Sequence, residues 1–225
     1  MNQDLVSYYS DRAKEYEKVY LNPAEQGDLQ SAEKIFQDLF ANKTVLEIAC
    51  DTGYWTERIA KTATSILATD INESVIEIAG KRKTEKITFA VADMFDLKST
   101  EKFDGVFGGF IWSHILRQDL NKFLEKVKSF LKPNGTIVFI DGKAVAGTNH
   151  DLKNITKTDE HGNTFQTRKL ENGTSHLVLK NFPTKEFLFQ KLSKIADDIN
   201  IINLEYYWIV SCKLNKKYEQ NESKS

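Results

Sequence analysis

Apolar and polar positions along this chain change period in a way that predicts alternating strands and helices. Five short apolar runs have the length of buried strands, and between them apolar residues recur at the three-to-four spacing of amphipathic helices. The runs are Thr44–Ala49, Ser65–Asp70, Lys86–Val91, Phe103–Ile111 and Thr136–Asp141. This alternation predicts an α/β fold in which a parallel sheet has helices on both faces.

Helical spacing surrounds these runs. Residues 1–40 are expected to be helical, most clearly from Ala32 to Phe40. Further helices are expected at Trp55–Ala60, at Glu73–Lys83 with Asn72 as the N-cap, and at Leu120–Leu131. The last of these should stop at Pro133-Asn134-Gly135, because proline and glycine interrupt a helix.

The pattern changes after Asp141. Residues 142–162 are polar and predict a loop or lid. Thr164–Leu170 and Ser175–Lys180 flank Glu171-Asn172-Gly173, which is a hairpin signal. We therefore expect 142–182 to be an insertion that carries the binding specificity of the protein, because loops carry specificity on such scaffolds.

The C-terminal part predicts a helix at Thr184–Ala196 and a closing strand pair at Asn200–Tyr206 and Trp208–Leu214. The charged tail 215–225 predicts disorder. The expected division of the chain is therefore a helical segment 1–40, one α/β domain 41–214 that contains the insertion, and the tail.

Composition narrows the function classes. The chain has 225 residues and a formal net charge of −1, which argues against binding along a nucleic-acid backbone. The two cysteines, Cys50 and Cys212, form neither a disulfide scaffold nor a metal-site spacing, so no metal is expected. No apolar run has the length of a membrane span and the N-terminus lacks a signal peptide, which predicts a cytoplasmic protein without membrane partners. The sequence indicates no oligomeric state.

Polar features follow three successive predicted strands. Glu47–Gly53 is a turn of small residues between a strand and a helix, a place where the backbone can approach a ligand. Asp70 ends the next strand, where an acid can accept the hydroxyls of a ribose. Asp93-Met94 follows the third strand, and a carboxylate beside a flexible apolar side chain can bind an adenine. Each acid has a plain alternative as a helix cap.

Taken together, these features resemble the class I S-adenosylmethionine-dependent methyltransferases. Glu47–Gly53 is similar to the first motif of that family, Asp70 to its ribose acid and Asp93-Met94 to its adenine-binding pair. Leu131–Gly135, followed by the fifth strand, resembles the LKPGG-type turn of the family. The opening from Tyr8 to Tyr16 resembles the segment that covers the cofactor in many members that act on small molecules.

The resemblance implies a Rossmann-like, doubly wound, seven-stranded and mostly parallel sheet whose last strand is antiparallel, with the hairpin inserted after strand 5. It implies S-adenosyl-L-methionine as cofactor and residues 1–40 as a cap over the cofactor site. It also implies methyl transfer to an oxygen or nitrogen atom of a small-molecule acceptor. The implied cofactor-binding residues are Tyr9, Tyr16, Glu47, Ala49, Cys50, Asp51, Gly53, Trp55, Asp70, Ile71, Asp93 and Met94.

One departure from the family pattern concerns the turn, which often reads Ala-Cys-Gly-Thr-Gly in similar members. Here Asp51 takes the place of the middle glycine. Aspartate tolerates a positive φ only at some cost, and its carboxylate would approach the carboxylate of the cofactor. We therefore expect cofactor binding that is weaker than in an Asp51→Gly variant.

Two residues are candidates for the base of methyl transfer, although the cofactor supplies the electrophile and a carboxylate acceptor needs no base. His114 follows the fourth strand and Asp141 ends the fifth. Packing or capping is the alternative for both residues. Phe107, Phe110 and Trp112 either line an apolar substrate pocket or fill the core.

The hairpin contributes further candidates. Arg168 and Lys169 either clamp an anionic substrate or form a solvated strand face. His150, His161 and His176 are expected at the surface unless the hairpin folds over the site.

Three other functions remain open on the sequence alone. One is a protein with a degenerate site that binds the cofactor with weak or no transfer, because of Asp51. Another is a different Rossmann nucleotide-dependent enzyme, which the absence of a GxGxxG fingerprint weakens. The third is a macromolecular methyltransferase, against which the lack of a basic appendage counts for nucleic acid.

Overall fold

The computed structural model describes residues 3–215 and contains a seven-stranded sheet in the order β3-β2-β1-β4-β5-β10-β9. Neighbouring strands from β3 to β5 are parallel, whereas β10 runs antiparallel to both β5 and β9. The predicted Rossmann-like fold with an antiparallel last strand is therefore confirmed. The strands are β1 Thr44–Ile48, β2 Ser65–Asp70, β3 Ile87–Val91, β4 Phe103–Gly109, β5 Leu131–Gly142, β9 Ala196–Asn203 and β10 Tyr207–Leu214.

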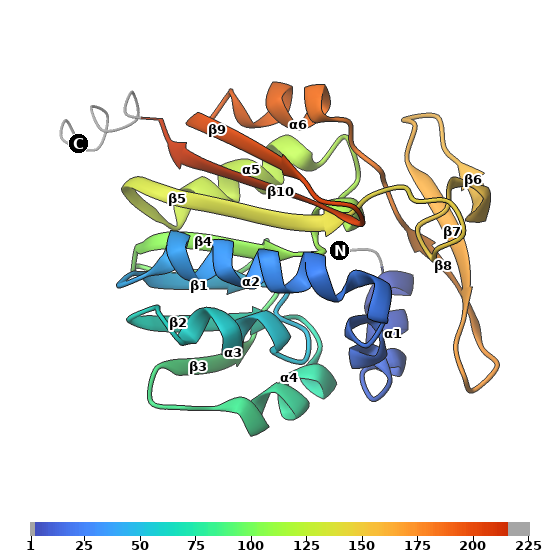
Figure 1. Ribbon diagram of the computed structural model, residues 1–225, viewed down its shortest axis with the longest axis horizontal. Helices are drawn as coiled ribbons and strands as arrows, with labels where there is room; N and C mark the ends of the chain where they lie inside the picture. Colours follow the sequence, from blue (N-terminus) through green and yellow to red (C-terminus); the bar gives the residue numbers. More distant parts are fainter. Residues whose placement is uncertain (1–2, 216–225) are drawn as a thin grey trace.

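Helices cover both faces of this sheet (Figure 1). One face packs against α2 (Gln26–Phe40) and α3 (Tyr54–Ala60), and the other against α5 (Leu120–Ser129) and α6 (Lys185–Leu192). The short helix α4 (Glu73–Ala79) contacts β2 and β3. This arrangement follows from strands that are apolar on both sides, because each side must be buried against a helix.

The side-chain alternation of the strands divides the core into two layers. In β4, Val106 packs with the residues of α5 and α6, while the next residue, Phe107, packs with those of α2 and α3. In β5, Phe139 and Ile140 divide in the same way. Successive side chains of a strand point to opposite faces, so continuous apolar runs are what a doubly covered sheet requires.

The glycines of β4 have a packing role. A Cβ built on Gly105 would lie 2.5 Å from the ring of Phe40, the last residue of α2. The absence of a side chain at Gly105 therefore lets α2 approach the centre of the sheet, which explains why a strand this well buried contains residues with low strand propensity.

The insertion forms a second, three-stranded antiparallel sheet in the order β6-β7-β8. Its strands are β6 Ile155–Thr158, β7 Thr164–Lys169 and β8 Ser175–Leu179. The predicted hairpin is β7–β8, but β6 lies in the segment that we expected to be a loop, which is a correction. The side chains of β6 are mostly exposed and give no apolar pattern that would predict a strand, although its backbone pairs with that of β7.

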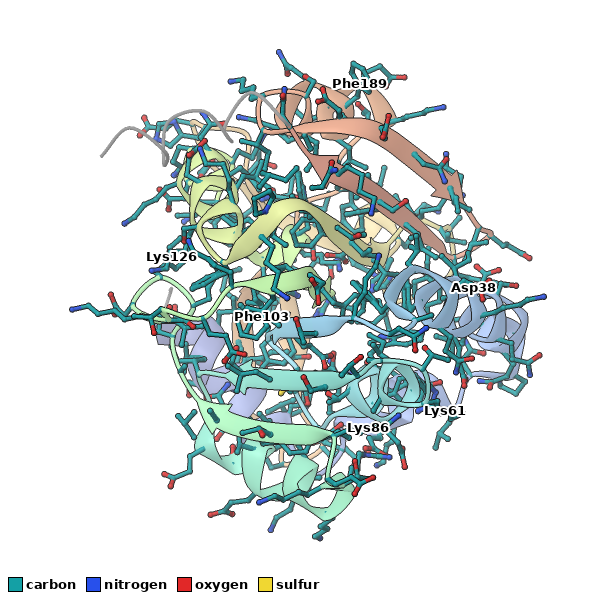
Figure 2. The ribbon with its side chains drawn as sticks, turned by 90° about the vertical axis from the view of Figure 1, so that its left-hand side faces the viewer. Asp38, Lys61, Lys86, Phe103, Lys126 and Phe189 are labelled. Carbon is teal, nitrogen blue, oxygen red and sulfur yellow. The ribbon has the colours of Figure 1, made fainter. Side chains whose placement is uncertain are left out.

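The first helix, α1 (Gln3–Arg12), packs on β8, and the two together lie across the carboxyl ends of the parallel strands (Figure 1). Figure 2 shows the opposite end of the sheet, where the chain enters β3 after Lys86 and β4 at Phe103. Any cavity between α1 and the sheet is therefore bounded by the loops that follow β1, β2, β3 and β4.

Several predicted helix boundaries were wrong. Residues 1–40 contain α1 and α2 separated by two 3-10 helices, Tyr16–Tyr20 and Pro23–Glu25, rather than continuous α-helix. Asn72 occupies the N-cap position of α4, but its side chain makes no capping hydrogen bond. The helix predicted at 184–196 ends at Leu192, and Ala196 is already the first residue of β9. The α-helices predicted at 73–83 and 120–131 end at Ala79 and Ser129, and residues 216–225 of the predicted tail lie outside the described residues.

The packing of α2 on β4 generates a prediction. Gly105→Ala should lower the free energy of unfolding by about 1–3 kcal/mol, because the new methyl group must displace the Phe40 ring in a packed core. Gly27→Ala, which meets no atom within 4 Å on the exposed side of α2, should leave it unchanged or raise it slightly. Urea denaturation of both variants checks this, and equal stabilities would contradict it.

Candidate functional site

The turn between β1 and α3 is unusually bent. Ala49, Asp51 and Gly53 all have positive φ, at 55°, 49° and 81°. The predicted positive φ at Asp51 is confirmed. Non-glycine residues in this region carry strain, so surrounding contacts must hold the turn in place.

Asp70 supplies those contacts. One oxygen of its carboxylate accepts the backbone N–H of Asp51 at 3.0 Å, and the other accepts the N–H of Asn72 at 2.9 Å. Burial raises the pKa of Asp70 from its ordinary value, against the effect of these hydrogen bonds. The side chain thus ties together the loops that follow β1 and β2.

The carboxylate of Asp51 faces the same space. It accepts the N–H of Thr52 at 2.7 Å, and burial together with the charge of Asp70 raises the pKa of Asp51 well above its usual range. Two carboxyl groups consequently lie at one end of the same crevice.

A cavity of about 610 Å³, including its open mouth, lies beside these acids, between α1 and the loops that follow β1 to β4. Its apolar walls include Leu5, Ile48 and Ala92. Eight of the residues predicted to bind cofactor or to catalyse line this one cavity: Tyr9, Tyr16, Ala49, Asp51, Asp70, Ile71, Met94 and His114.

The other predicted cofactor residues do not line it. Glu47 is buried beneath the turn, where burial raises its pKa to about 8. Trp55 packs in the core against Phe36, and Gly53 precedes the first residue of α3. Cys50 is also buried in the core and holds the turn by donating its backbone N–H to Thr69. These residues support the turn from below.

Asp93 also lies off the cavity wall, although its neighbour Met94 is on it. Its side chain accepts the N–H of Phe95 at 2.9 Å, as a turn-forming aspartate does. Of the predicted adenine-binding pair, therefore, only the apolar residue, Met94, lines the cavity.

His114 joins the cavity to α1. Its Nε2 lies 2.7 Å from the hydroxyl of Tyr9, and its Nδ1 lies 2.5 Å from the carbonyl oxygen of Leu179. A carbonyl can only accept, so Nδ1 carries the proton and Nε2 accepts from Tyr9. Burial first and the nearby Lys180 cation second lower the pKa of His114 to about 3, which keeps the ring neutral.

A second and larger cavity, about 1750 Å³ with its open mouth included, lies between α1 and the inserted sheet. Both cavities are lined by the same four residues, Tyr9, Tyr16, Phe110 and His114, so they meet at that wall. Phe110 adopts a φ of 58° at this boundary, whereas Phe107 and Trp112 are buried in the core.

Asp141 lines neither cavity. It is fully buried and forms an ion pair with Lys180 at 2.7 Å, and it also accepts the N–H groups of Ser113 and Gly142. Burial opposes ionisation, but the Lys180 ammonium outweighs it and the pKa of Asp141 is lowered.

Lys180 belongs to this site but was not among the residues predicted from the sequence. Only 2% of this residue is exposed, and its ammonium also donates to the hydroxyl of Ser113 at 2.8 Å. The signal available was a lysine that directly follows the apolar pair Val178-Leu179, a position where a strand is still buried.

The hairpin folds over the site, so not all the histidines that we expected at the surface are exposed. His150 is half-buried against Gly142, and burial lowers its pKa to about 2. His176 lies 5.5 Å from the ring of Tyr8, while His161 is exposed, as expected. Arg168 lines the larger cavity instead of forming a fully solvated face.

Within residues 3–215, no group of three or more histidine, cysteine, aspartate or glutamate side chains is placed to hold a metal ion. In the same part of the chain, no helix has both the length and the apolar character needed to span a membrane.

Part of this chain is similar in sequence to known methyltransferases. Residues 45–135 match the model of a methyltransferase domain family. A malonyl-[acyl-carrier protein] O-methyltransferase of Priestia megaterium is 30% identical over 100 residues, which are 42% of this chain and 35% of that protein. A phosphoethanolamine N-methyltransferase of Triticum aestivum is 33% identical over 105 residues, 44% of this chain and 21% of that protein. The chain thus spans about a third or less of the length of these curated relatives.

The fold has a solved counterpart over nearly its whole length. The structure of a DhpI–SAH complex superposes with a TM-score of 0.77 at 23% identity, covering 95% of this chain and 96% of the other. The strand order, the bent turn after β1 and the domain match all agree with the fold that the sequence motifs predict. The chain is therefore similar to a methyltransferase domain over residues 45–135, and it has the fold of the DhpI–SAH complex. Both findings agree with the class I S-adenosylmethionine-dependent methyltransferases that its sequence motifs resemble.

Proposed function

We propose that this chain transfers a methyl group from S-adenosylmethionine to an oxygen or nitrogen atom of a small-molecule acceptor. The observation that carries the proposal is the pair of adjoining cavities with Tyr9, Tyr16, Phe110 and His114 in their common wall. A cofactor in the smaller cavity and an acceptor in the larger one would meet at that wall. Methyl transfer needs just such an in-line approach of two bound molecules.

The residues of the smaller cavity fit an adenosyl sulfonium compound. Asp70 offers a buried carboxylate for ribose hydroxyls, and Ile71, Ala92 and Met94 offer apolar surface for a purine. The backbone at Ala49 and Gly109 leaves room for the amino-acid end, because neither residue has a side chain larger than a methyl group. When bound, the cofactor supplies an electrophilic methyl group.

The chain contributes alignment and exclusion of water. Helix α1 covers the cavity, and its Tyr9 is held in place by the hydrogen bond to neutral His114. Exclusion of water strengthens the electrostatic interactions within such a site.

His114 is the better placed of the two base candidates. Its Nε2 lies at the common wall, where it can accept a proton from an acceptor hydroxyl or amine once Tyr9 gives up that position. Asp141 lies on neither wall and its carboxylate is engaged by Lys180, Ser113 and Gly142. The low pKa of His114 makes it a weak base, so it suits an acceptor whose own proton is labile.

The direct test is calorimetric binding of S-adenosylhomocysteine, the demethylated cofactor. We expect measurable binding by the unmodified chain and an affinity at least ten times lower in Asp70→Asn. This substitution removes the carboxylate proposed to accept the ribose hydroxyls, and it weakens the hydrogen bonds that join the two loops. Asp104→Asn is the matched control, because Asp104 pairs with Lys132 and Thr44 outside the lining of either cavity. Absence of binding by the unmodified chain would refute the proposal, whereas binding without transfer to any acceptor would favour a degenerate cofactor-binding protein.

Asp51 generates a second prediction. Asp51→Gly should bind S-adenosylhomocysteine about five to ten times more tightly, because it removes a carboxylate from the end of the cavity expected to hold the carboxylate of the ligand. Ala49→Gly relieves a positive φ of similar size without removing a charge, so its affinity should equal that of the unmodified chain. Equal or weaker binding by Asp51→Gly would show that the Asp51 carboxylate does not oppose the ligand.

Neutral His114 predicts a loss of stability in acid. The pKa of His114 is about 3 in the folded chain and about 6.5 when unfolded, so the unfolded state binds more protons between these values. The free energy of unfolding therefore falls as pH drops below about 6.5. Between pH 7.5 and 5.0, His114→Gln should lose up to about 2 kcal/mol less than the unmodified chain. Urea denaturation at both pH values checks this, with exposed His161→Gln as the control, and an equal loss in all three proteins would contradict a neutral His114.

A further inference from the structure

We propose that the methyl acceptor carries an oxyanion, a carboxylate or phosphoryl group, which binds in the larger cavity at the wall that carries Arg12 and Arg168. This inference rests on the proposed methyl transfer and specifies its substrate class. The cavity wall is rich in cations, Arg168 is held in a fixed position, and one buried donor on the wall has no partner.

The larger cavity is strongly biased toward positive charge. Its lining contains the acids Glu15 and Glu25, and Glu25 accepts the hydroxyl of Tyr207. The lining cations are Arg12, Lys18, Lys153, Arg168, Lys169 and Lys180. This bias is local, because the whole chain has a formal net charge of only −1. A cavity lined mainly by one sign of charge concentrates ligands of the opposite sign.

The two arginines differ from the neighbouring lysines in their partners. Lys18 pairs with Glu171, and Lys180 pairs with Asp141. Within residues 3–215, neither Arg12 nor Arg168 has an acidic side chain at ion-pair distance. Both are partly buried, and burial of a cation costs free energy of desolvation. The negative charge of Asp51 acts on Arg12 only from beyond ion-pair distance.

Aromatic and amide groups hold these two guanidiniums in place. The guanidinium carbons of Arg12 and Arg168 lie 5.6 and 5.9 Å from the centroid of the same Tyr8 ring. The Nη2 of Arg168 donates to the Oε1 of Gln166 at 2.9 Å. A planar donor group that is already oriented loses less entropy when it binds a carboxylate or phosphoryl oxygen.

Gln166 supplies the independent observation. It is 1% exposed and lines the cavity, yet its Nε2 has no hydrogen-bond partner. Its Oε1 is occupied by Arg168, which fixes the amide so that the remaining group is a donor. A buried donor without an acceptor costs free energy, and an oxyanion beside Arg168 is the kind of ligand that can remove this cost.

Electrostatic effects on neighbouring groups agree with this geometry. After burial, the positive charges of Lys180 and Arg168 both contribute to lowering the pKa of His114 and of His150. Asp141 acts in the opposite direction on both rings, so Arg168 is one of several charges that reach the wall shared with the smaller cavity. An oxyanion held by the arginines would leave the rest of the acceptor facing that wall.

The experiment uses the full chain saturated with S-adenosylhomocysteine and titrated by calorimetry at constant ionic strength in chloride. The probes are inorganic phosphate, acetate and methylammonium. We expect at least one of the two anions to bind in the millimolar range and methylammonium not to bind. Arg168→Gln and, separately, Arg12→Gln should weaken the anion at least tenfold.

Lys157→Gln is the matched control. It removes one positive charge from the same inserted sheet, but Lys157 is exposed and does not line the cavity. This variant should bind the anion within a factor of two of the unmodified chain. All the variants should retain their affinity for S-adenosylhomocysteine, which also shows that they fold.

The outcomes separate the two proposals. Tighter binding of phosphate indicates a phosphoryl acceptor, and tighter binding of acetate indicates a carboxylate. Binding of S-adenosylhomocysteine with no anion binding, or with equal anion binding by Arg168→Gln and Lys157→Gln, would overturn the oxyanion inference and leave the proposed methyl transfer intact. A chain that does not take up S-adenosylhomocysteine would overturn the proposed function, and the acceptor class with it.

Discussion

The smaller cavity depends on the carboxylate of Asp70, which accepts one backbone N–H from the turn after β1 and one from the loop after β2. That turn contains two non-glycine residues with positive φ, a conformation that would relax without external support. Because parallel strands end at the same edge of a sheet, one short side chain can reach both loops. The cavity wall thereby acquires its shape before any ligand arrives.

The fold was accessible from the sequence because its signals are local. Continuous apolar runs such as Ser65–Asp70 mark strands buried on both faces, and the positive φ at Asp51 followed from its position in a turn that is usually glycine-rich. β6 was missed because a strand of a small exposed sheet has no apolar alternation to reveal it. Boundaries such as Leu192 were missed because tertiary pairing of β9 overrides the helical spacing that precedes it.

The candidate site was less accessible, because its chemistry comes from segments that are distant in sequence. Tyr9 and Asp70 could be named from motifs, and both line the cavity. Lys180 and Gln166 carry no motif, and their importance appears only when the insertion packs against α1 and the end of β5. A buried lysine paired with Asp141 fixes the position of that insertion, since breaking such a pair would leave an uncompensated charge inside the protein.

The N-terminal helix that covers the cavities makes its contacts with residues synthesised long after it. Tyr9 forms a hydrogen bond with His114, which lies 105 positions further along the chain. The partner of Lys18 is Glu171, 153 positions away, and the partner of Glu25 is Tyr207, 182 positions away. During translation these residues therefore leave the ribosome long before the residues with which they pair. The central sheet through β5 can assemble while α1 is still without β8, and a nascent chain interrupted before residue 175 would present the smaller cavity open to solvent.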